Sequence, residues 1–164
     1  KSIVSQPNTS AKYKTDNGVY YKGAHILHTL RYLIGEDILQ QSLKEFINMP
    51  KELPHNQTTT KEFISLINEN TGNDLYWFFN QYLYKSALPT LMVKKEIIND
   101  KKHIDLWWDD EGFIMPLEIS FTSFDGVRMR KLKLTNSPTR IAIPEKSNLI
   151  IDPDEWLLYQ VREI

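Results

Sequence analysis

The chain has 164 residues, of which 41% are hydrophobic and 12% aromatic, so it can bury a core and is not expected to be disordered. Its 20 basic and 21 acidic residues give a net charge of -1, without the basic excess that a nucleic-acid binder uses to neutralise phosphates. It contains no cysteine, which excludes disulfides, thiolate catalysis and cysteine-ligated zinc.

The first 16 residues are polar and show no periodicity, so we expect an extended lead-in there. No apolar run approaches the roughly 18 residues that a membrane-spanning helix needs, and the start "KSIVSQPNTS" lacks the apolar core of a signal peptide. We therefore expect a soluble chain with no membrane-spanning segment. The sequence begins without Met, which suggests a piece of a longer protein.

From residue 17 to about residue 88 the apolar residues follow the period of amphipathic helices, and the breaks between them predict about four helices. The first follows "TDNG" and is expected to end at Gly35 in the left-handed conformation. The second begins at Glu36, whose charge suits the positive end of a helix, and stops before Pro50. Their predicted apolar positions are Ala24, Leu27, Leu30 and Ile34 in the first helix and Leu39, Leu43, Phe46 and Ile47 in the second.

The third and fourth helices carry recognisable start signals. The stretch "TTKE", Thr59 to Glu62, predicts a capping box, and Gly72 lies beyond the end of that third helix. Asp74 is expected to cap a fourth helix, "LYWFFNQYLY". The broad apolar face of the fourth helix consists of Leu75, Phe78, Phe79, Tyr82 and Leu83.

After Pro89 the hydrophobic period changes from 3.6 to 2, which predicts strands. The predicted strands are "TLMVKKEII", "HIDLWW", "MPLEISFTS", "VRMRKLKLT", "TRIAIP" and "NLIID". Because only short turns separate them, six or seven strands in a small antiparallel, Ig-like β-sandwich are favoured over a parallel sheet. The inward positions are expected to include Leu117, Ile119, Phe121 and, less regularly, Met129, Leu132 and Leu134. The predicted class is thus α+β, with the lead-in at 1–16, the helical unit at 17–88 and the sandwich at 89–164.

Two histidines, His25 and His28, lie three residues apart on the first helix and could share a face, as some metal ligands in helical bundles do. They lack a nearby carboxylate, and the H-E-x-x-H pattern of zinc peptidases is absent from the chain. We therefore favour ordinary helix residues over metal ligands. His55 and His103 fall in a predicted loop and strand and add no further ligand.

The adjacent tryptophans of "LWWDDEG", Trp107 and Trp108, must point to opposite faces of a strand. An outward ring could stack on a sugar or a partner, although aromatic residues at hairpin ends more often pack locally. The motifs of serine hydrolases and phosphate-binding loops are both absent.

The stretch "VYYKGA" places Tyr20 and Tyr21 at the start of a helix, which is an electropositive position. A tyrosine hydroxyl keeps its proton at neutral pH, because the reference pKa of tyrosine is about 10, and it can donate a hydrogen bond to a developing oxyanion. Most tyrosines at helix starts are structural, so the residues alone leave both roles open.

Several motifs taken together resemble the carboxy-terminal part of the M1 (gluzincin) family of zinc aminopeptidases, especially its bacterial members. They are "YYKGA", the "GE" turn, "TTKEF", "WFFNQY", the proline before the sandwich and the final "LIIDPDEWLLY". The motifs occur in the family's order from about residue 17 to the end of the chain. Each is weak alone, but the set is specific.

The resemblance implies a role for Tyr20, which matches the family tyrosine that lies opposite the zinc ion and hydrogen-bonds the oxyanion of the tetrahedral intermediate. In the family, the zinc ligands, the general-base glutamate and the Gly-x-Met-Glu-Asn substrate loop all lie upstream of this tyrosine, and none of them is found in this chain. We therefore expect a parent protein that uses zinc to remove N-terminal residues from peptide substrates. The chain itself is expected to be inactive and to bind no metal or other cofactor.

The alternative is a non-catalytic interaction or scaffold module, because some members of the family have lost their zinc ligands. If upstream helices are missing, Phe78, Phe79 and Tyr82 could form a bare apolar face, which would be covered by self-association or by the sandwich. Many bacterial relatives are exported, so the family is compatible with a periplasmic or exported location that the residues themselves do not indicate.

Overall fold

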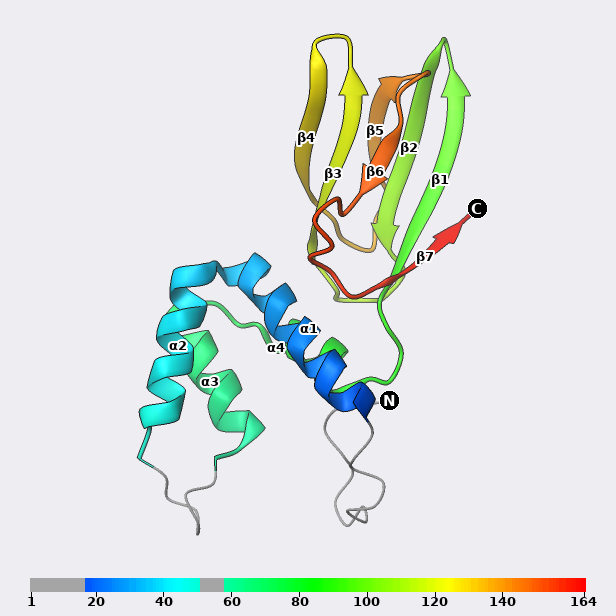
Figure 1. Ribbon diagram of the computed structural model, residues 1–164. Helices are drawn as coiled ribbons and strands as arrows, with labels where there is room; N and C mark the ends of the chain where they lie inside the picture. Colours follow the sequence, from blue (N-terminus) through cyan, green and yellow to red (C-terminus); the bar gives the residue numbers. More distant parts are fainter. Residues whose placement is uncertain (1–16, 51–57) are drawn as a thin grey trace. The chain divides into compact units, whose positions relative to one another are not determined.

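The computed structural model describes residues 17–50 and 58–164 (Figure 1). The predicted lead-in and His55 lie outside these residues. Contacts divide the chain into two compact units, Lys1–Ser86 and Ala87–Ile164. The described part of the first contains helices and the second contains strands, which confirms the predicted α+β class with a helical unit followed by a β-sandwich.

Within residues 17–50 and 58–86, the helical unit contains three longer helices and a short composite one. The elements are α1 (Asn17–Ile34), α2 (Glu36–Asn48), α3 (Thr60–Thr71), α4 (Tyr76–Phe79) and the π-helix η3 (Asn80–Tyr84). Helices α2 and α3 pack side by side (Figure 1). The predicted fourth helix is therefore a single α-helical turn that continues as a π-helix.

Both ends of α3 follow the predicted capping chemistry, whereas the ends of the other helices follow it only in part. The Thr59 hydroxyl accepts a hydrogen bond from the Glu62 amide, and the Glu62 carboxylate accepts one from the Thr59 amide, which completes the capping box of α3. Gly72 ends α3 in the left-handed conformation with φ of 64°. The Asp74 carboxylate accepts a hydrogen bond from the Tyr76 amide at 2.9 Å, but the N-cap of α4 is Leu75 and no side chain caps this helix, so the predicted cap at Asp74 is wrong. Gly35 has a φ of 91° and a ψ of 155°. Its φ is positive, as predicted, but this ψ lies outside the left-handed helical conformation that was expected.

The buried face of α1 differs from the predicted one. Ile26, Thr29 and Leu30 are buried, whereas Ala24 and Leu27 are exposed. The helical period identified the apolar positions, but it could not tell which of them have neighbours that cover them. Helix α1 thus keeps apolar side chains on a face that the described chain does not bury.

The expected bare face on the fourth helix is absent, because Phe78, Phe79 and Tyr82 are almost completely buried. Their rings belong to a chain of edge-on and tilted contacts that continues from Phe79 to Phe63 and from Phe63 to Phe46. Such contacts add to the stabilisation from the buried area itself. No self-association is needed to cover these three rings.

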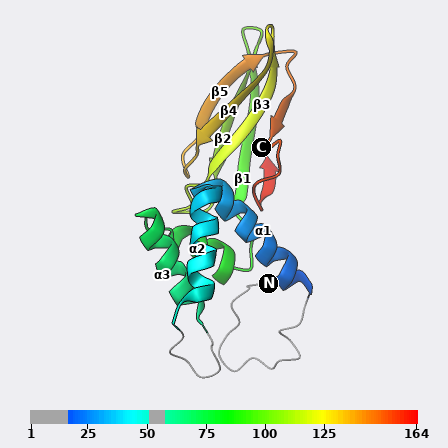
Figure 2. The same cartoon turned by 60° about the vertical axis from the view of Figure 1, so that its left-hand side comes forward.

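The second unit contains seven strands in two sheets. They are β1 (Thr90–Ile98), β2 (Lys101–Trp108), β3 (Pro116–Ser123), β4 (Gly126–Lys133), β5 (Thr139–Pro144), β6 (Leu149–Ile151) and β7 (Gln160–Glu163). One sheet has the order β5-β2-β1-β7 and the other β4-β3-β6. Figure 2 shows the strands of the two sheets from a second side. The β-sandwich of the prediction is confirmed.

One edge of the larger sheet departs from the antiparallel pattern. Strand β7 pairs in parallel with β1, with Thr90 opposite Gln160, so this sheet is mixed. All four residues of β7 are exposed, and a short exposed strand has no alternating pattern from which its position could be predicted.

The sandwich core consists of side chains from alternate positions of the facing strands. Leu117, Ile119 and Phe121 are buried as predicted. Strand β4 is exposed along nearly its whole length, however, and Met129 is among its exposed residues. The expected inward position of Met129 is therefore wrong. Strand β4 lies at the edge of its sheet, and Met129 pairs with Ser120 of β3. Because side chains alternate along a strand, Ser120 and Met129 point to the face opposite to that of the inward Ile119 and Phe121.

Candidate functional site

Tyr20, the candidate oxyanion donor, lies in the first turn of α1. Its side chain is 73% exposed, and that of the adjacent Tyr21 is 75% exposed. Both hydroxyls are thus available to a group outside the described chain. The first turn of a helix also carries backbone amides without intrahelical acceptors, which makes it electropositive.

Lys22 attaches the start of α1 to the end of the π-helix. Its Nζ donates a hydrogen bond of 3.1 Å to the carbonyl of Lys85, the residue that follows η3. The Lys85 amide in turn donates one of 3.3 Å to the carbonyl of Asn80, the first residue of η3. Burial lowers the pKa of Lys22. A cation is favourable where a helix ends in carbonyls, so Lys22 fixes the turn from which Tyr20 projects. Lys22 is recognisable in the sequence as the lysine of the Lys-Gly step. That its hydrogen-bond partner, Lys85, lies 63 residues away could not be predicted from the sequence.

The two histidines of α1 are close together without forming a metal site. The ring centroids of His25 and His28 are 5.8 Å apart, and the rings meet edge to face. Arg31 Nη2 lies 3.0 Å from His28 Nδ1, and because a guanidinium only donates, that nitrogen is an acceptor. Arg31 also forms an ion pair with Glu36 at 3.3 Å. The positive charge of the Arg31 guanidinium beside His28 Nδ1 disfavours a metal cation at that nitrogen. This supports the interpretation of both histidines as ordinary helix residues.

A zinc site would need several His, Asp or Glu side chains close together within residues 17–50 and 58–164. No group of three or more His, Asp or Glu side chains that could hold an ion occurs among them. The donor atoms of this part of the chain therefore do not fit a zinc site.

The paired tryptophans have different environments. Trp108 is completely buried, and its indole Nε1 donates to the Met115 carbonyl at 2.8 Å. Its ring also contacts the rings of Phe113 and Tyr159. Trp107 is only partly buried. Trp108 is thus a core residue with its polar atom satisfied, and only Trp107 remains available for the stacking role considered above.

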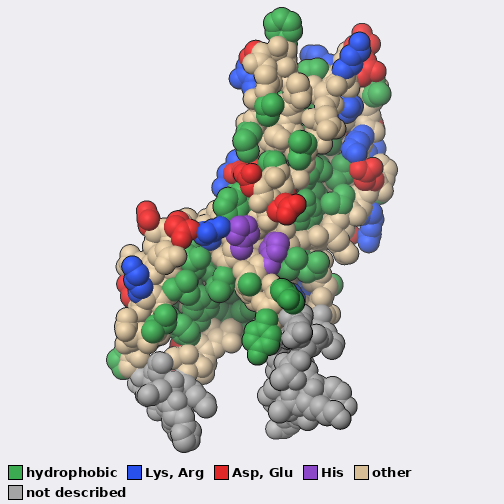
Figure 3. Space-filling view, in the orientation of Figure 1, with side chains coloured by type: hydrophobic (Ala, Val, Ile, Leu, Met, Phe, Trp, Pro, Cys, Tyr) green, Lys and Arg blue, Asp and Glu red, His purple; other side chains and the backbone are tan. Residues whose placement is uncertain are grey.

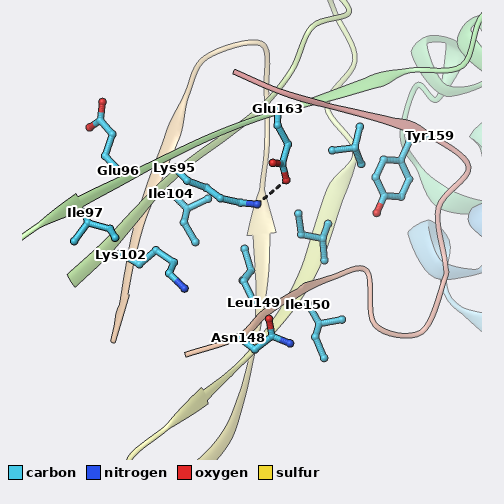
Figure 4. A pocket seen from close by; sticks show the side chains of 12 residues that line it. Lys95, Glu96, Ile97, Lys102, Ile104, Asn148, Leu149, Ile150, Tyr159 and Glu163 are labelled. Carbon is cyan, nitrogen blue, oxygen red and sulfur yellow. Dashed lines mark hydrogen bonds and ion pairs between the residues drawn. The ribbon is translucent and has the colours of Figure 1, made fainter. Parts of the chain in front are cut away.

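The sandwich contains a groove of about 730 Å³ between its two sheets (Figure 4). Its walls carry apolar side chains such as Ile104 and Leu149. Its charged groups are paired, since Lys95 forms an ion pair with Glu163 at 2.5 Å and Lys102 donates to the Ser147 carbonyl at 2.9 Å. Burial raises the pKa of Tyr159, at one end of the groove, to about 12. With these groups satisfied by the fold, the groove does not assemble a catalytic set.

A helix needs about 20 predominantly apolar residues to cross a bilayer. Within the described ranges, no helix is both long and apolar enough to do so.

Known proteins that are similar to this chain include two aminopeptidases, although no protein-family profile matches it. Aminopeptidase N of Lactococcus lactis subsp. lactis is 26% identical over 137 residues, which cover 80% of this chain and 15% of that protein. The crystal structure of Legionella pneumophila aminopeptidase A in complex with aspartic acid matches with a TM-score of 0.69 at 15% identity, over 99% of this chain and 20% of that one.

These similarities confirm the resemblance that the sequence motifs indicated. The likeness to Aminopeptidase N is in sequence, and the likeness to the Legionella enzyme shows that the helical unit and the sandwich follow a known fold. The matched part of the chain spans only 15% of the length of the first protein and 20% of that of the second. It is therefore related to a part of an aminopeptidase.

Proposed function

We propose that this chain is the carboxy-terminal portion of an M1-type zinc aminopeptidase, a protein that removes N-terminal residues from peptides. The observation that carries the proposal is the 26% identity to Aminopeptidase N over 137 residues. The M1 motifs, from Tyr20 to the proline before the sandwich, support it.

Within this proposal Tyr20 donates its hydroxyl proton in a hydrogen bond to the oxyanion that forms when the first peptide bond is attacked. A donor aimed at developing charge lowers the barrier because it binds the transition state more strongly than the substrate. The exposed hydroxyl at the start of α1 supports this role. So does Lys22, which restrains the turn that carries Tyr20.

The proposal assigns the zinc ion and the general base to the upstream part of the parent protein. The described residues do not supply a fitting set of ligands, so we derive no step through the metal from this chain. When bound in the parent, zinc would supply an activated water for attack on the peptide carbonyl. We accordingly propose that the chain by itself has no peptidase activity.

The exposed face of α1 is also consistent with a missing neighbour. Tyr20, Ala24 and Leu27 recur at helical spacing on one side of α1, and all three are exposed. Hydrophobic side chains gather over the helices on the face drawn in Figure 3. In the proposal this side of α1 faces the rest of the catalytic domain.

A non-catalytic scaffold remains the second candidate, because the same carboxy-terminal unit could occur in a protein without zinc ligands. Reading the coding sequence upstream of Lys1 separates the two. An H-E-x-x-H motif followed by a second glutamate supports the aminopeptidase. An upstream domain of the same family without that motif supports the scaffold and contradicts our proposal.

A further inference from the structure

Strand β4 lies at an open edge of the smaller sheet. In the described part of the chain it pairs only with β3, from Pro116 opposite Lys133 to Ser123 opposite Gly126. Seven of its eight residues are exposed and the remaining one is half-buried. An edge of this length presents a row of backbone amides and carbonyls that a further extended strand can pair with.

The side chains of this edge are predominantly basic. Strand β4 carries Arg128, Arg130, Lys131 and Lys133 and no acidic residue. Two of these cations have carboxylates close by in the fold, since Arg128 pairs with Asp125 and Lys131 lies opposite Glu118.

The other two cations have no acidic residue across the ladder. Arg130 lies opposite Ile119, and its guanidinium carbon is 5.4 Å from the centroid of the Phe121 ring. Lys133 lies opposite Pro116. The two are three residues apart, so their side chains point to opposite faces of the strand.

An apolar row adjoins this edge on the outer face of the sheet. Met129 lies opposite Ser120 on one side, and Ile150 lies opposite Ser120 on the other, so the three share one row across the sheet. Met129 is 57% exposed and Ile150 49% exposed. Val127, two residues along β4 on the same face, is 73% exposed. A strand added beyond β4 could cover Val127 and Met129.

The charges of β4 restrict which strand can be added. A second copy pairing through its own β4 would place basic residues against basic residues, and like charges directly opposite each other are destabilising. A strand with carboxylates opposite Arg130 and Lys133 would instead form favourable cross-strand pairs. The same cations that oppose self-pairing therefore select an acidic partner.

We propose that the β4 edge binds an extended acidic peptide segment as an additional strand of the β4-β3-β6 sheet. The segment carries two carboxylates three positions apart, one opposite Arg130 and the other opposite Lys133, and small or β-branched residues between them. Backbone pairing supplies the ladder, and the two cations supply the preference for acidic sequence. This site is independent of the proposed peptidase role.

The test is a titration of the isotope-labelled chain with blocked eight-residue peptides of Val and Thr that contain two Glu residues three positions apart. We expect shifts of the β4 amide signals in NMR, and protection from hydrogen exchange at alternate β4 amides. A peptide with Lys in place of Glu should bind at least about fivefold more weakly, as should the Glu peptide to Arg130→Gln/Lys133→Gln. A Glu peptide with N-methylated backbone amides should not bind.

We expect the Arg130→Gln/Lys133→Gln variant to fold normally, because both side chains are exposed. Unchanged amide signals of β1 and β2 would show that it does. Equal binding of the Lys peptide, or of the N-methylated one, would overturn the proposal, as would shifts confined to other strands. Tighter binding of an RNA oligonucleotide at the same amides would overturn the identity of the partner. Concentration-dependent pairing of the chain with itself through β4 would do so as well.

Discussion

The ammonium group of Lys22 donates a 3.1 Å hydrogen bond to the carbonyl of Lys85 and so joins two ends of the helical unit. Lys22 lies near the start of α1, two residues after Tyr20, and Lys85 follows the π-helix η3 directly. The turn that carries the candidate oxyanion donor is thereby held against a second helix end rather than left to fray, as free helix starts do.

Lys22→Met should destabilise the helical unit by about 1 kcal/mol, because it removes a hydrogen bond from a charged donor while it keeps most of the aliphatic stem. Lys22→Arg should restore most of this loss, since the cation and its donors remain. Urea denaturation followed by helical circular dichroism measures both changes.

Lys61→Met is a matched control, because Lys61 is an exposed lysine of α3. Its free energy of unfolding should stay within about 0.5 kcal/mol of the original value. If Lys22→Met and Lys61→Met behave alike, Lys22 does not anchor α1.

The sandwich contains an ion pair whose contribution should depend on pH. Arg140 of β5 donates to both carboxylate oxygens of Asp105 of β2, at 2.7 and 2.6 Å. These hydrogen bonds from Arg140 lower the pKa of Asp105. Because the folded pKa is below the unfolded one, the stabilisation is present above the unfolded value of about 3.9 and is lost as the pH falls through the folded value.

Asp105→Asn should therefore destabilise the sandwich by about 1 kcal/mol at pH 7, a modest value because the Arg140 side chain is half exposed. The difference from the original chain should shrink as the pH falls below about 4. Urea titrations at pH 7, 5, 4 and 3 measure it, with the exposed Asp154→Asn as control. A difference that is constant over this range would show that the charge of Asp105 is not what stabilises the sheet.

The capping box of α3 can be tested by one substitution. Thr59→Ala removes the side-chain oxygen that accepts the Glu62 amide at 3.2 Å, and should destabilise the helical unit by about 1 kcal/mol. Thr60→Ala, at the next position, leaves the cap intact and should have a much smaller effect. Thermal unfolding of both variants gives the comparison, and equal losses would mean that the hydroxyl of Thr59 does not act as a cap.

Local chemistry made part of the fold predictable. The capping box at Thr59 and the positive φ of Gly72 depend on residues within a few positions of one another, and both were predicted correctly. The change of hydrophobic period at Pro89 likewise marks the start of the first strand, β1, at Thr90. Each of these features is a property of a short segment.

Features that depend on distant neighbours were not predictable. Phe78 and Phe79 were expected to be left bare by missing upstream helices and to be covered by self-association or by the sandwich, whereas each contacts another ring of the helical unit itself. The parallel pairing of β7 with β1 joins segments about 70 residues apart. Tyr20 was found from a family motif, but its support by Lys22 and Lys85 required the structure.

The most direct test of the central claim is the kcat of the full-length parent protein carrying Tyr20→Phe, with Tyr21→Phe as the control. The two rings are adjacent and almost equally exposed, so they differ chiefly in their direction from α1. Our account predicts that Tyr20→Phe lowers kcat by about 100- to 1,000-fold, while Tyr21→Phe leaves it nearly unchanged. An unaltered kcat in Tyr20→Phe, with the protein folded, would contradict the assignment of Tyr20 as the oxyanion donor.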